Sequence, residues 1–237
     1  MNYRGFPLAL LKLYTAEVAK AKGMLKGQDN FNEKKIEILA ELMRIRELCC
    51  DPSLVYADYK GESSKREATI DLIKTAIDGG HKVLLFSQFT SMLALLEKDL
   101  KAEGIGYYKI IGDTNKAKRI ELVDSFNSDS TPVFLISLKA GGTGLNLTSA
   151  DIVIHYDPWW NVAVQNQATD RAHRIGQTKR VTVYKMIAEN TIEERIMTLQ
   201  ETKKKLASEI ISTDNISLSS LSKDDLLDLF NVSSQEK

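Results

Sequence analysis

The chain has 237 residues, of which 43% are hydrophobic and 27% charged, and its 32 basic and 32 acidic residues give a formal net charge of zero. This composition is typical of one or two globular domains with a buried core, and it excludes a protein that coats nucleic acid over its whole surface, though not one with a local basic groove. The sequence contains no apolar run of about 18 residues and no secretory signal pattern. We therefore expect an intracellular protein without a membrane segment, cytoplasmic and nucleoid-associated in a prokaryote or nuclear in a eukaryote.

The N-terminal residues 1–65 have the pattern of a helical segment followed by a linker. The stretch IEILAELMRIREL (36–48) is typical of a helix with one apolar side. Its apolar positions at helical spacing are Ile36, Leu39, Leu42, Met43 and Leu48. Cys49 and Cys50 are adjacent and are the only cysteines, so they exclude a disulfide framework, and we expect both to be reduced and in or near the core.

Residues 66–190 alternate short apolar runs with helical patterns. The apolar runs are KVLLFS (82–87), YYKII (107–111), PVFLIS (132–137), IVIHY (152–156) and VTVYKM (181–186). They are β-branched or aromatic and apolar almost throughout, which is typical of strands buried on both faces. Helical stretches separate the earlier runs, and the first of these stretches ends on Gly104. This order predicts an α/β fold, a doubly wound parallel sheet flanked by N-terminal and C-terminal helices.

Residues 191–237 have the pattern of C-terminal helices. The stretch TIEERIMTLQETKKKLASEII (191–211) predicts one long helix. Its inward-facing residues are expected to be Ile192, Ile196, Leu199 and Leu206. Ser222 and Asp225 have the spacing of a capping box before a last helix, DDLLDLF.

A glycine-rich stretch, SLKAGGTGLNL (137–147), follows the third apolar run directly. In an open α/β sheet, ligands gather beyond the carboxyl ends of the strands, and Gly141, Gly142 and Gly144 would let backbone amides approach a phosphate. The alternative is a glycine-rich turn without a ligand. The stretch is neither a Walker A loop nor a dinucleotide-binding fingerprint, because the chain lacks both spacings.

Two arginines three residues apart lie in QATDRAHRIGQ (167–177). If the preceding residues continue as one helix, Gln167, Arg171 and Arg174 form a single polar stripe, and Gly176 lies just past the helix end. The stripe would suit a nucleotide's terminal phosphates, because the guanidinium fork matches phosphate geometry. The alternative is that Arg174 complements the helix dipole and Arg171 is a surface charge.

Taken together, VLLFSQF, ISLKAGGTGLNLTSADIVIHYDPWWN and QATDRAHRIGQ resemble motifs IV, V and VI of the SWI/SNF family of ATP-dependent DNA translocases, which are helicase-like motors of the second superfamily. One departure is Val162, where the family usually has proline after the Trp-Asn pair. The resemblance implies a RecA-like second lobe over 66–190, with residues 191–237 as brace helices. It also implies that ATP and Mg²⁺ are bound mainly by a first lobe, whose Walker A lysine and Asp-Glu pair this chain lacks. We therefore expect this chain alone to be inactive.

The resemblance also assigns residues to the site. It implies that Arg171 and Arg174 are catalytic arginine fingers, which neutralise charge at the γ-phosphate across the cleft between the lobes. The nucleotide contacts that it implies are Gln167, Asp170, Gly142 and Gly144. The DNA contacts that it implies are Ser87, Gln88, Ser137, Lys139, Gly141, Thr143, Trp160 and Asn161. Such hydroxyl, amide and lysine groups suit phosphates and fix position without reading sequence. Trp159 is expected to pack in the core.

The expected function is that of the second motor lobe of an ATP-dependent double-stranded DNA translocase that remodels nucleoprotein complexes. Its partners would be double-stranded DNA, the N-terminal RecA-like lobe of the same polypeptide and a DNA-bound protein complex. One alternative is the lobe of an RNA or strand-separating helicase, and another is a stand-alone, non-catalytic module that binds nucleic acid or protein. No metal site is predicted in the chain, because its three histidines lack metal-ligand spacing with cysteines or acidic residues.

Overall fold

The structure is a computed structural model, and it describes residues 8–26, 31–138, 140, 145–160, 162–172, 177, 179–209 and 221–231. The chain divides into two compact units. We call Arg66–Met186 the sheet unit, and we call Met1–Lys65 together with Ile187–Lys237 the helical unit. The N-terminal and C-terminal flanks, which the sequence suggested as separate segments, thus form one unit.

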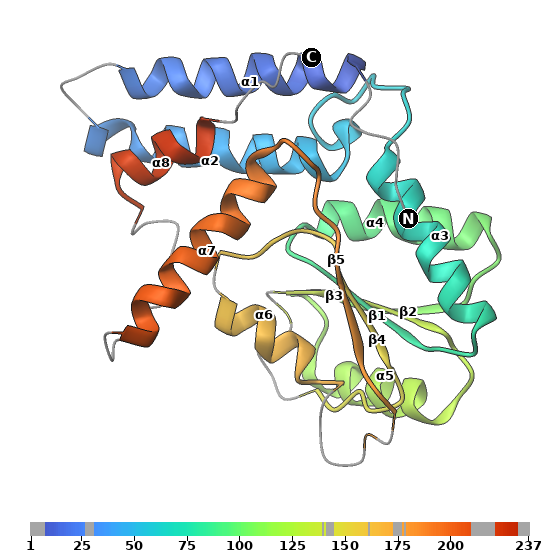
Figure 1. Ribbon diagram of the computed structural model, residues 1–237. Coiled ribbons are helices and arrows are strands. Elements are labelled where there is room, and N and C mark those ends of the chain that lie inside the picture. The colour runs from blue at the N-terminus through green and yellow to red at the C-terminus, as the bar shows by residue number, and fades with distance from the viewer. Residues whose placement is uncertain are drawn as a thin grey trace. The chain divides into compact units, whose positions relative to one another are not determined.

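The sheet unit is built on a five-stranded sheet in which every neighbouring pair of strands is parallel. The strands are β1 (Val83–Ser87), β2 (Tyr107–Ile110), β3 (Val133–Ser137), β4 (Ile152–His155) and β5 (Thr182–Lys185). Their order is β2-β3-β1-β4-β5, which places β1 at the centre (Figure 1). The chain therefore winds from the central strand to both edges, and the predicted doubly wound parallel sheet is confirmed.

Helices cover both faces of this sheet. They are α3 (Ser64–Asp78), α4 (Thr90–Ala102), α5 (Lys116–Ser128) and α6 (Val162–Thr169). Figure 1 shows α3 and α4 on one side of the sheet and α5 on the other. On the side of α5, Phe86 and Phe134 from the sheet share a core cluster with Phe126 from α5 and Ala168 from α6. Gly104, just beyond α4, has a φ of +68°, so the predicted glycine end of that helix is confirmed.

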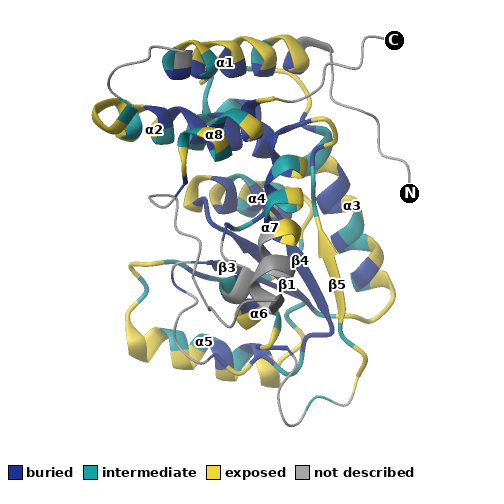
Figure 2. Ribbon diagram, turned by 60° about the vertical axis from the view of Figure 1, so that its left-hand side comes forward, coloured by how far each residue is buried: buried dark blue, intermediate teal, exposed yellow. Residues whose placement is uncertain are grey.

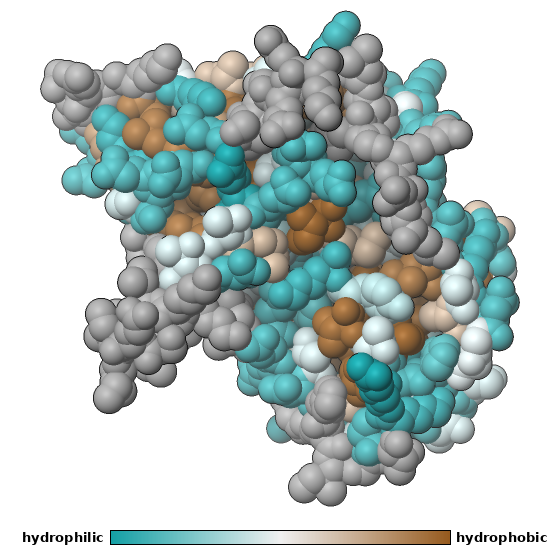
Figure 3. Space-filling view, in the orientation of Figure 1, coloured by the Kyte–Doolittle hydropathy of each residue, from teal (hydrophilic) through white to brown (hydrophobic). Residues whose placement is uncertain are grey.

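The strands differ sharply in burial, as Figure 2 shows. Every residue of β1, β3 and β4 is buried, as predicted. The prediction was wrong for β5, where all four residues are exposed, and only partly right for β2, where three of four residues are partly buried; both strands lie at an edge of the sheet. Val183 and Tyr184 are 40% and 39% exposed, and Figure 3 shows hydrophobic side chains at the surface over this strand.

The helical unit consists of packed helices from both ends of the chain. They are α1 (Leu8–Lys26), α2 (Phe31–Cys50), the short 3₁₀ helix η1 (Pro52–Leu54), α7 (Ile192–Glu209) and α8 (Lys223–Phe230). The predicted capping box of α8 is present, with the Ser222 and Asp225 side chains each bonded to the other's backbone N–H. Ile36 is 80% exposed, so its predicted inward position is wrong, whereas Leu42 and Leu48 are fully buried. Cys49 and Cys50 are buried and free.

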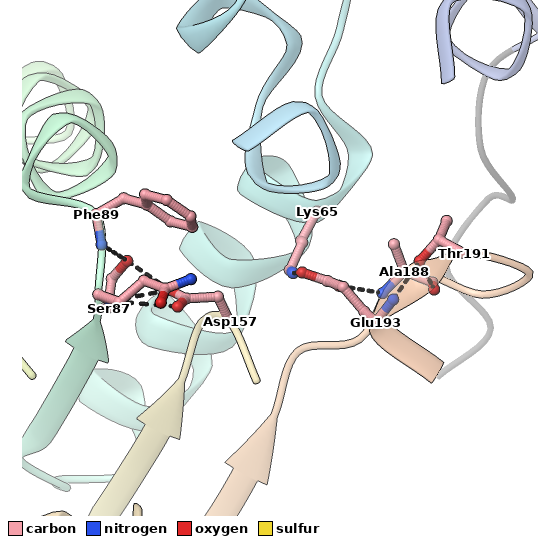
Figure 4. A network of polar contacts seen from close by, with 8 residues as sticks. Lys65, Ser87, Phe89, Asp157, Ala188, Thr191 and Glu193 are labelled. Carbon is pink, nitrogen blue, oxygen red and sulfur yellow. Dashed lines mark hydrogen bonds and ion pairs between the residues drawn. The ribbon is translucent and has the colours of Figure 1, made fainter. Parts of the chain in front are cut away.

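A buried ion pair connects the start of α3 to the start of α7 within the helical unit (Figure 4). Lys65 Nζ donates to both carboxylate oxygens of Glu193 at 2.7 Å, and the Glu193 carboxylate also accepts from the Ala188 N–H at 2.8 Å. The Tyr14 hydroxyl accepts from the Ile192 N–H at 2.7 Å and so caps α7. Within the described ranges, no helix has the length and apolarity needed to cross a membrane.

Candidate functional site

The carboxyl end of β1 is joined to the segment after β4 by one buried carboxylate. Asp157, which is 1% exposed, accepts hydrogen bonds from the Ser87 hydroxyl and from the Gln88 N–H (Figure 4). The Ser87 hydroxyl in turn accepts from the Phe89 N–H at 3.1 Å. Phe89 is the N-cap residue of α4, so Ser87 and Asp157 supply acceptors to backbone donors at the start of that helix. The loop after β1 is thereby held against the loop after β4.

Four residues expected to contact DNA lie in the described part, and all are buried. Ser87 is 0%, Gln88 8%, Ser137 1% and Trp160 4% exposed. The Ser87 hydroxyl already has partners within the sheet unit on both sides. The Ser87 hydroxyl thus helps to hold the loop after β1 in place, and contact of the four side chains with DNA stays a prediction. Trp159 packs against the core cluster of the sheet unit, as expected.

The helix that was predicted to carry the arginine stripe is shorter than expected. α6 ends at Thr169, and the Ala172 N–H then donates to the Thr169 carbonyl in a tighter turn. The Arg171 carbonyl accepts from the Leu147 N–H at 3.1 Å, a bond to another segment that sequence periodicity does not report. The predicted continuous helix therefore stops before Arg171, and Gln167, which is exposed, does not share a helical stripe with the buried Arg171.

The Arg171 side chain lies inside the sheet unit and is 4% exposed. Its guanidinium carbon is 5.8 Å from the centroid of the Phe86 ring, within the range of a cation–π contact. The His155 ring is stacked on the same phenylalanine, with 5.6 Å between centroids and 24° between planes. The first of the two predicted catalytic arginines thus lies over β1, next to the core.

His155 joins the end of β4 to the end of α6. Its Nε2 lies 2.9 Å from the Thr169 hydroxyl oxygen, and that hydroxyl can also donate to the Gln165 carbonyl. The tautomer of the ring sets which of the two groups donates in this contact. Burial, with a smaller contribution from the charge of Lys185, lowers the pKa of His155 to about 4, so the ring is neutral at physiological pH.

Several predicted site residues lie outside the described part. They are Lys139, Gly141, Gly142, Thr143, Gly144, Asn161 and Arg174. Their neighbours in sequence are described: Ser137 ends β3, Trp160 follows β4, and Ala172 and Gln177 flank the segment that contains Arg174. Asp170, the remaining predicted nucleotide contact, is exposed.

Two residues that sequence reasoning did not assign have central places in this arrangement. Asp157 follows a buried strand and precedes a proline, and this position in the sequence could have indicated a structural role. Gln177 is the last residue of the arginine motif, and its Nε2 donates to the carbonyls of Thr148, Ala150 and Ala172. Neither residue type stands out without the geometry.

Among the described residues, no group of three or more His, Cys, Asp or Glu side chains is placed to hold a metal ion. They do include the guanidinium of Arg171 and the exposed amide of Gln167. Such donors suit the phosphates of a nucleotide.

The comparisons with known proteins agree with this geometry. The model of the helicase conserved C-terminal domain matches residues 64–176. An uncharacterized ATP-dependent helicase of Mycoplasma pneumoniae is 40% identical over 220 residues, which are 92% of this chain and 21% of that protein. The chain spans about a fifth of the length of the curated relatives it matches.

Solved structures share the fold. The SWI2/SNF2 ATPase core of Sulfolobus solfataricus in complex with double-stranded DNA is 30% identical, with a TM-score of 0.79 over 97% of this chain and 49% of that chain. The C-terminal part of the Fun30 ATPase domain is 32% identical, with a TM-score of 0.60 over 92% of this chain and 74% of that chain. Identity, coverage and fold together place the chain in the SWI2/SNF2 family, as its helicase-like C-terminal lobe.

Proposed function

We propose that the chain is the second motor lobe of an ATP-dependent translocase that moves along double-stranded DNA and remodels protein–DNA complexes. Two similarities support this. The Mycoplasma pneumoniae relative is described as an ATP-dependent helicase, and the Sulfolobus solfataricus core was solved with double-stranded DNA. The ATPase activity would belong to this chain joined to a first lobe, which we call the joined protein. The Walker A lysine and the acidic pair of a first lobe are absent from this sequence.

One observation carries the proposal: the hydrogen bond of 3.1 Å from the Leu147 N–H to the Arg171 carbonyl. Leu147 closes the glycine-rich stretch, whose preceding residues are the proposed DNA contacts. Arg171 opens the segment of the two arginines, which are the proposed nucleotide contacts. A backbone bond between these segments makes a shift of one move the other, and a motor needs such a link between its fuel site and its track.

On the nucleotide side, we propose that Arg174 and Arg171 serve ATP bound by the first lobe, with Gln167, Asp170, Gly142 and Gly144 as further contacts. The arginines neutralise the charge that develops during phosphoryl transfer, an effect worth about 10³- to 10⁵-fold in rate. Arg174 makes the direct contact. Arg171, which is 4% exposed, lies over the Phe86 ring and there holds the start of the segment that carries Arg174. Mg²⁺ would be held by carboxylates of the first lobe and would supply charge neutralisation between the phosphates.

On the DNA side, we propose that Lys139, Gly141, Thr143 and Asn161 contact the phosphates of one strand. Lysine and backbone amide donors neutralise phosphate without reading bases, which suits a motor that must move over any sequence. Ser87, Gln88, Ser137 and Trp160 are buried next to these segments, and the bonds of the Ser87 hydroxyl hold the end of β1.

The test is the rate of ATP hydrolysis with and without double-stranded DNA, measured for this chain alone and for the chain joined to its first lobe. We expect activity in the joined protein only, stimulated by duplex DNA and lost in Arg174→Ala. Unchanged turnover in Arg174→Ala contradicts the arginine's role. Unwinding of a blunt duplex, or stimulation by RNA alone, indicates a helicase. Duplex binding without any ATP hydrolysis in the joined protein indicates a non-catalytic module.

A further inference from the structure

The side chain of Gln177 is the centre of a hydrogen-bonded junction in the sheet unit. Its Nε2 lies 2.8 Å from the Ala150 carbonyl oxygen and 3.1 Å from those of Thr148 and Ala172. Its Oε1 accepts from the Lys179 N–H at 2.9 Å. Carbonyls on one side and an N–H donor on the other fix the orientation of the amide, whose NH₂ group shares its two hydrogens among the three carbonyls.

The junction joins two segments that the proposed function assigns to different ligands. Thr148 and Ala150 directly follow the glycine-rich stretch, and the Ala150 N–H donates to the carbonyl of its last residue, Leu147. Ala172 belongs to the arginine segment. Together with the bond from Leu147 to Arg171, the Gln177 amide gives these two segments two separate links, so neither can slide past the other without breaking both.

The same amide also closes a short loop of chain. Ala172 and Gln177 are five positions apart, and the bond between them brings both ends of the intervening segment to one point. Arg174 lies within that segment. The described residues on either side of Arg174 are thus linked to each other, and a link of this kind is a physical basis of preorganisation.

We propose that Gln177 is a positioning residue, which closes the segment carrying Arg174 onto the end of the glycine-rich stretch and so presents the arginine to the nucleotide. The proposal rests on the proposed function of Arg174 and goes beyond it by naming the group that holds the arginine. Gln177 itself touches neither ATP nor DNA. Its loss therefore acts on the rate of the chemical step and not on ground-state binding.

The first variant to measure, in the joined two-lobe protein, is Gln177→Met, which keeps the length of the side chain and removes its donors. We expect kcat for DNA-stimulated ATP hydrolysis to fall by about 10- to 100-fold, with KM for ATP and the affinity for duplex DNA within about threefold of the parent. Gln177→Glu places an oxygen opposite the three carbonyls and should lose at least as much.

Asn127 provides a matched control. From the end of α5, its amide donates to the Asn146 carbonyl at 2.8 Å and accepts from the Ser149 N–H, so it holds the same stretch without touching the arginine segment. We expect Asn127→Leu to keep the parent kcat. An equal loss of kcat in Asn127→Leu and Gln177→Met would show that only the stability of the stretch matters, and would overturn the proposal.

A double-mutant cycle with Arg174→Lys separates this inference from the proposed function, and lysine leaves a residual rate that can still be measured. If Gln177 acts through Arg174, adding Gln177→Met to Arg174→Lys lowers kcat much less than it does in the parent. Losses that multiply contradict the inference, as does a parent-like Gln177→Met. A parent-like rate in Arg174→Ala contradicts the proposed function itself, and the inference falls with it.

Discussion

The guanidinium of Arg171 lies over the ring of Phe86, with 5.8 Å from its central carbon to the ring centroid. Phe86 is the fourth residue of the central strand and is fully buried. An arginine of the proposed nucleotide site therefore contacts the core of the sheet unit directly. A cation–π contact is worth about 0.5 kcal/mol at an exposed site and about 2 kcal/mol when it is desolvated. The core is thus part of what sets the conformation of the arginine.

Replacing Phe86 tests whether this contact matters for turnover. We expect Phe86→Leu to lower kcat of the joined protein by about 2- to 30-fold, the rate equivalent of the cation–π energy. Phe134→Leu is the control, because Phe134 is equally buried on β3 but makes its ring contacts with Tyr108 and Phe126. Both variants should lose stability. Equal kcat values in the two would show that Phe86 acts on stability alone.

Ser87→Ala separates a positioning role from a DNA contact. Removing the hydroxyl takes one donor from the buried Asp157, so the free energy of unfolding should fall by about 1–3 kcal/mol in urea denaturation. The affinity for duplex DNA and its dependence on salt should not change. Lys139→Ala should instead weaken the binding of duplex DNA. It should reduce the slope of the logarithm of the binding constant against the logarithm of the salt concentration by about one. A weaker affinity for duplex DNA in Ser87→Ala, with the salt slope unchanged, would restore that side chain to the DNA contacts, because a neutral hydroxyl releases no counterions.

The sequence predicted the positions of the strands, because short apolar runs rich in β-branched residues are typical of a parallel sheet. The prediction of burial was right for the inner strands. β1, β3 and β4 are such strands. β5 has a similar composition but lies at an edge of the sheet and is exposed. Apolar composition alone cannot predict whether other elements cover the faces of a strand. The end of α6 was missed for a related reason. Just beyond the helix end, the Arg171 carbonyl accepts from the Leu147 N–H. Helical periodicity cannot predict a bond to a residue so remote in sequence.

For the site, the sequence indicated the right segments but not the task of each side chain. The residue types after β1 and β3 suit phosphate contacts, yet Ser87 and Ser137 are turned into the unit. Whether a hydroxyl faces solvent or a buried carboxylate depends on the partner strand, here on Asp157 beyond β4. Gln177 is part of the arginine motif, but its residue type indicates no role there. Three carbonyls lie around its amide only in the folded chain.

His155 predicts a specific dependence of stability on pH. Its pKa is about 4 in the folded protein and 6.5 as the ordinary value, so the unfolded state binds more protons between these two values. Its contribution to stability is complete above pH 6.5 and is lost as the pH falls toward 4, by about 3 kcal/mol in all. His155→Asn should lack this component. Urea denaturation of both proteins between pH 7 and pH 4.5 measures it, and parallel profiles would contradict the assignment.

The buried ion pair between Lys65 and Glu193 should be costly to break from one side. The two side chains are 9% and 1% exposed, so Lys65→Met leaves an uncompensated buried carboxylate, and we expect a loss of about 3–5 kcal/mol in the free energy of unfolding. Lys74 is the matched control, because its ion pair with Glu103 has a similar distance, 2.6 Å, but its partners are 40% and 42% exposed.

Lys74→Met should therefore cost no more than about 1 kcal/mol. Adding Glu193→Gln to Lys65→Met should recover part of the loss, since the amide oxygen can still accept from the Ala188 N–H without carrying a charge. If Lys65→Met cost no more than Lys74→Met, the carboxylate would have to be neutralised by protonation or hydration. In that case the connection between the starts of α3 and α7 would not depend on the ion pair.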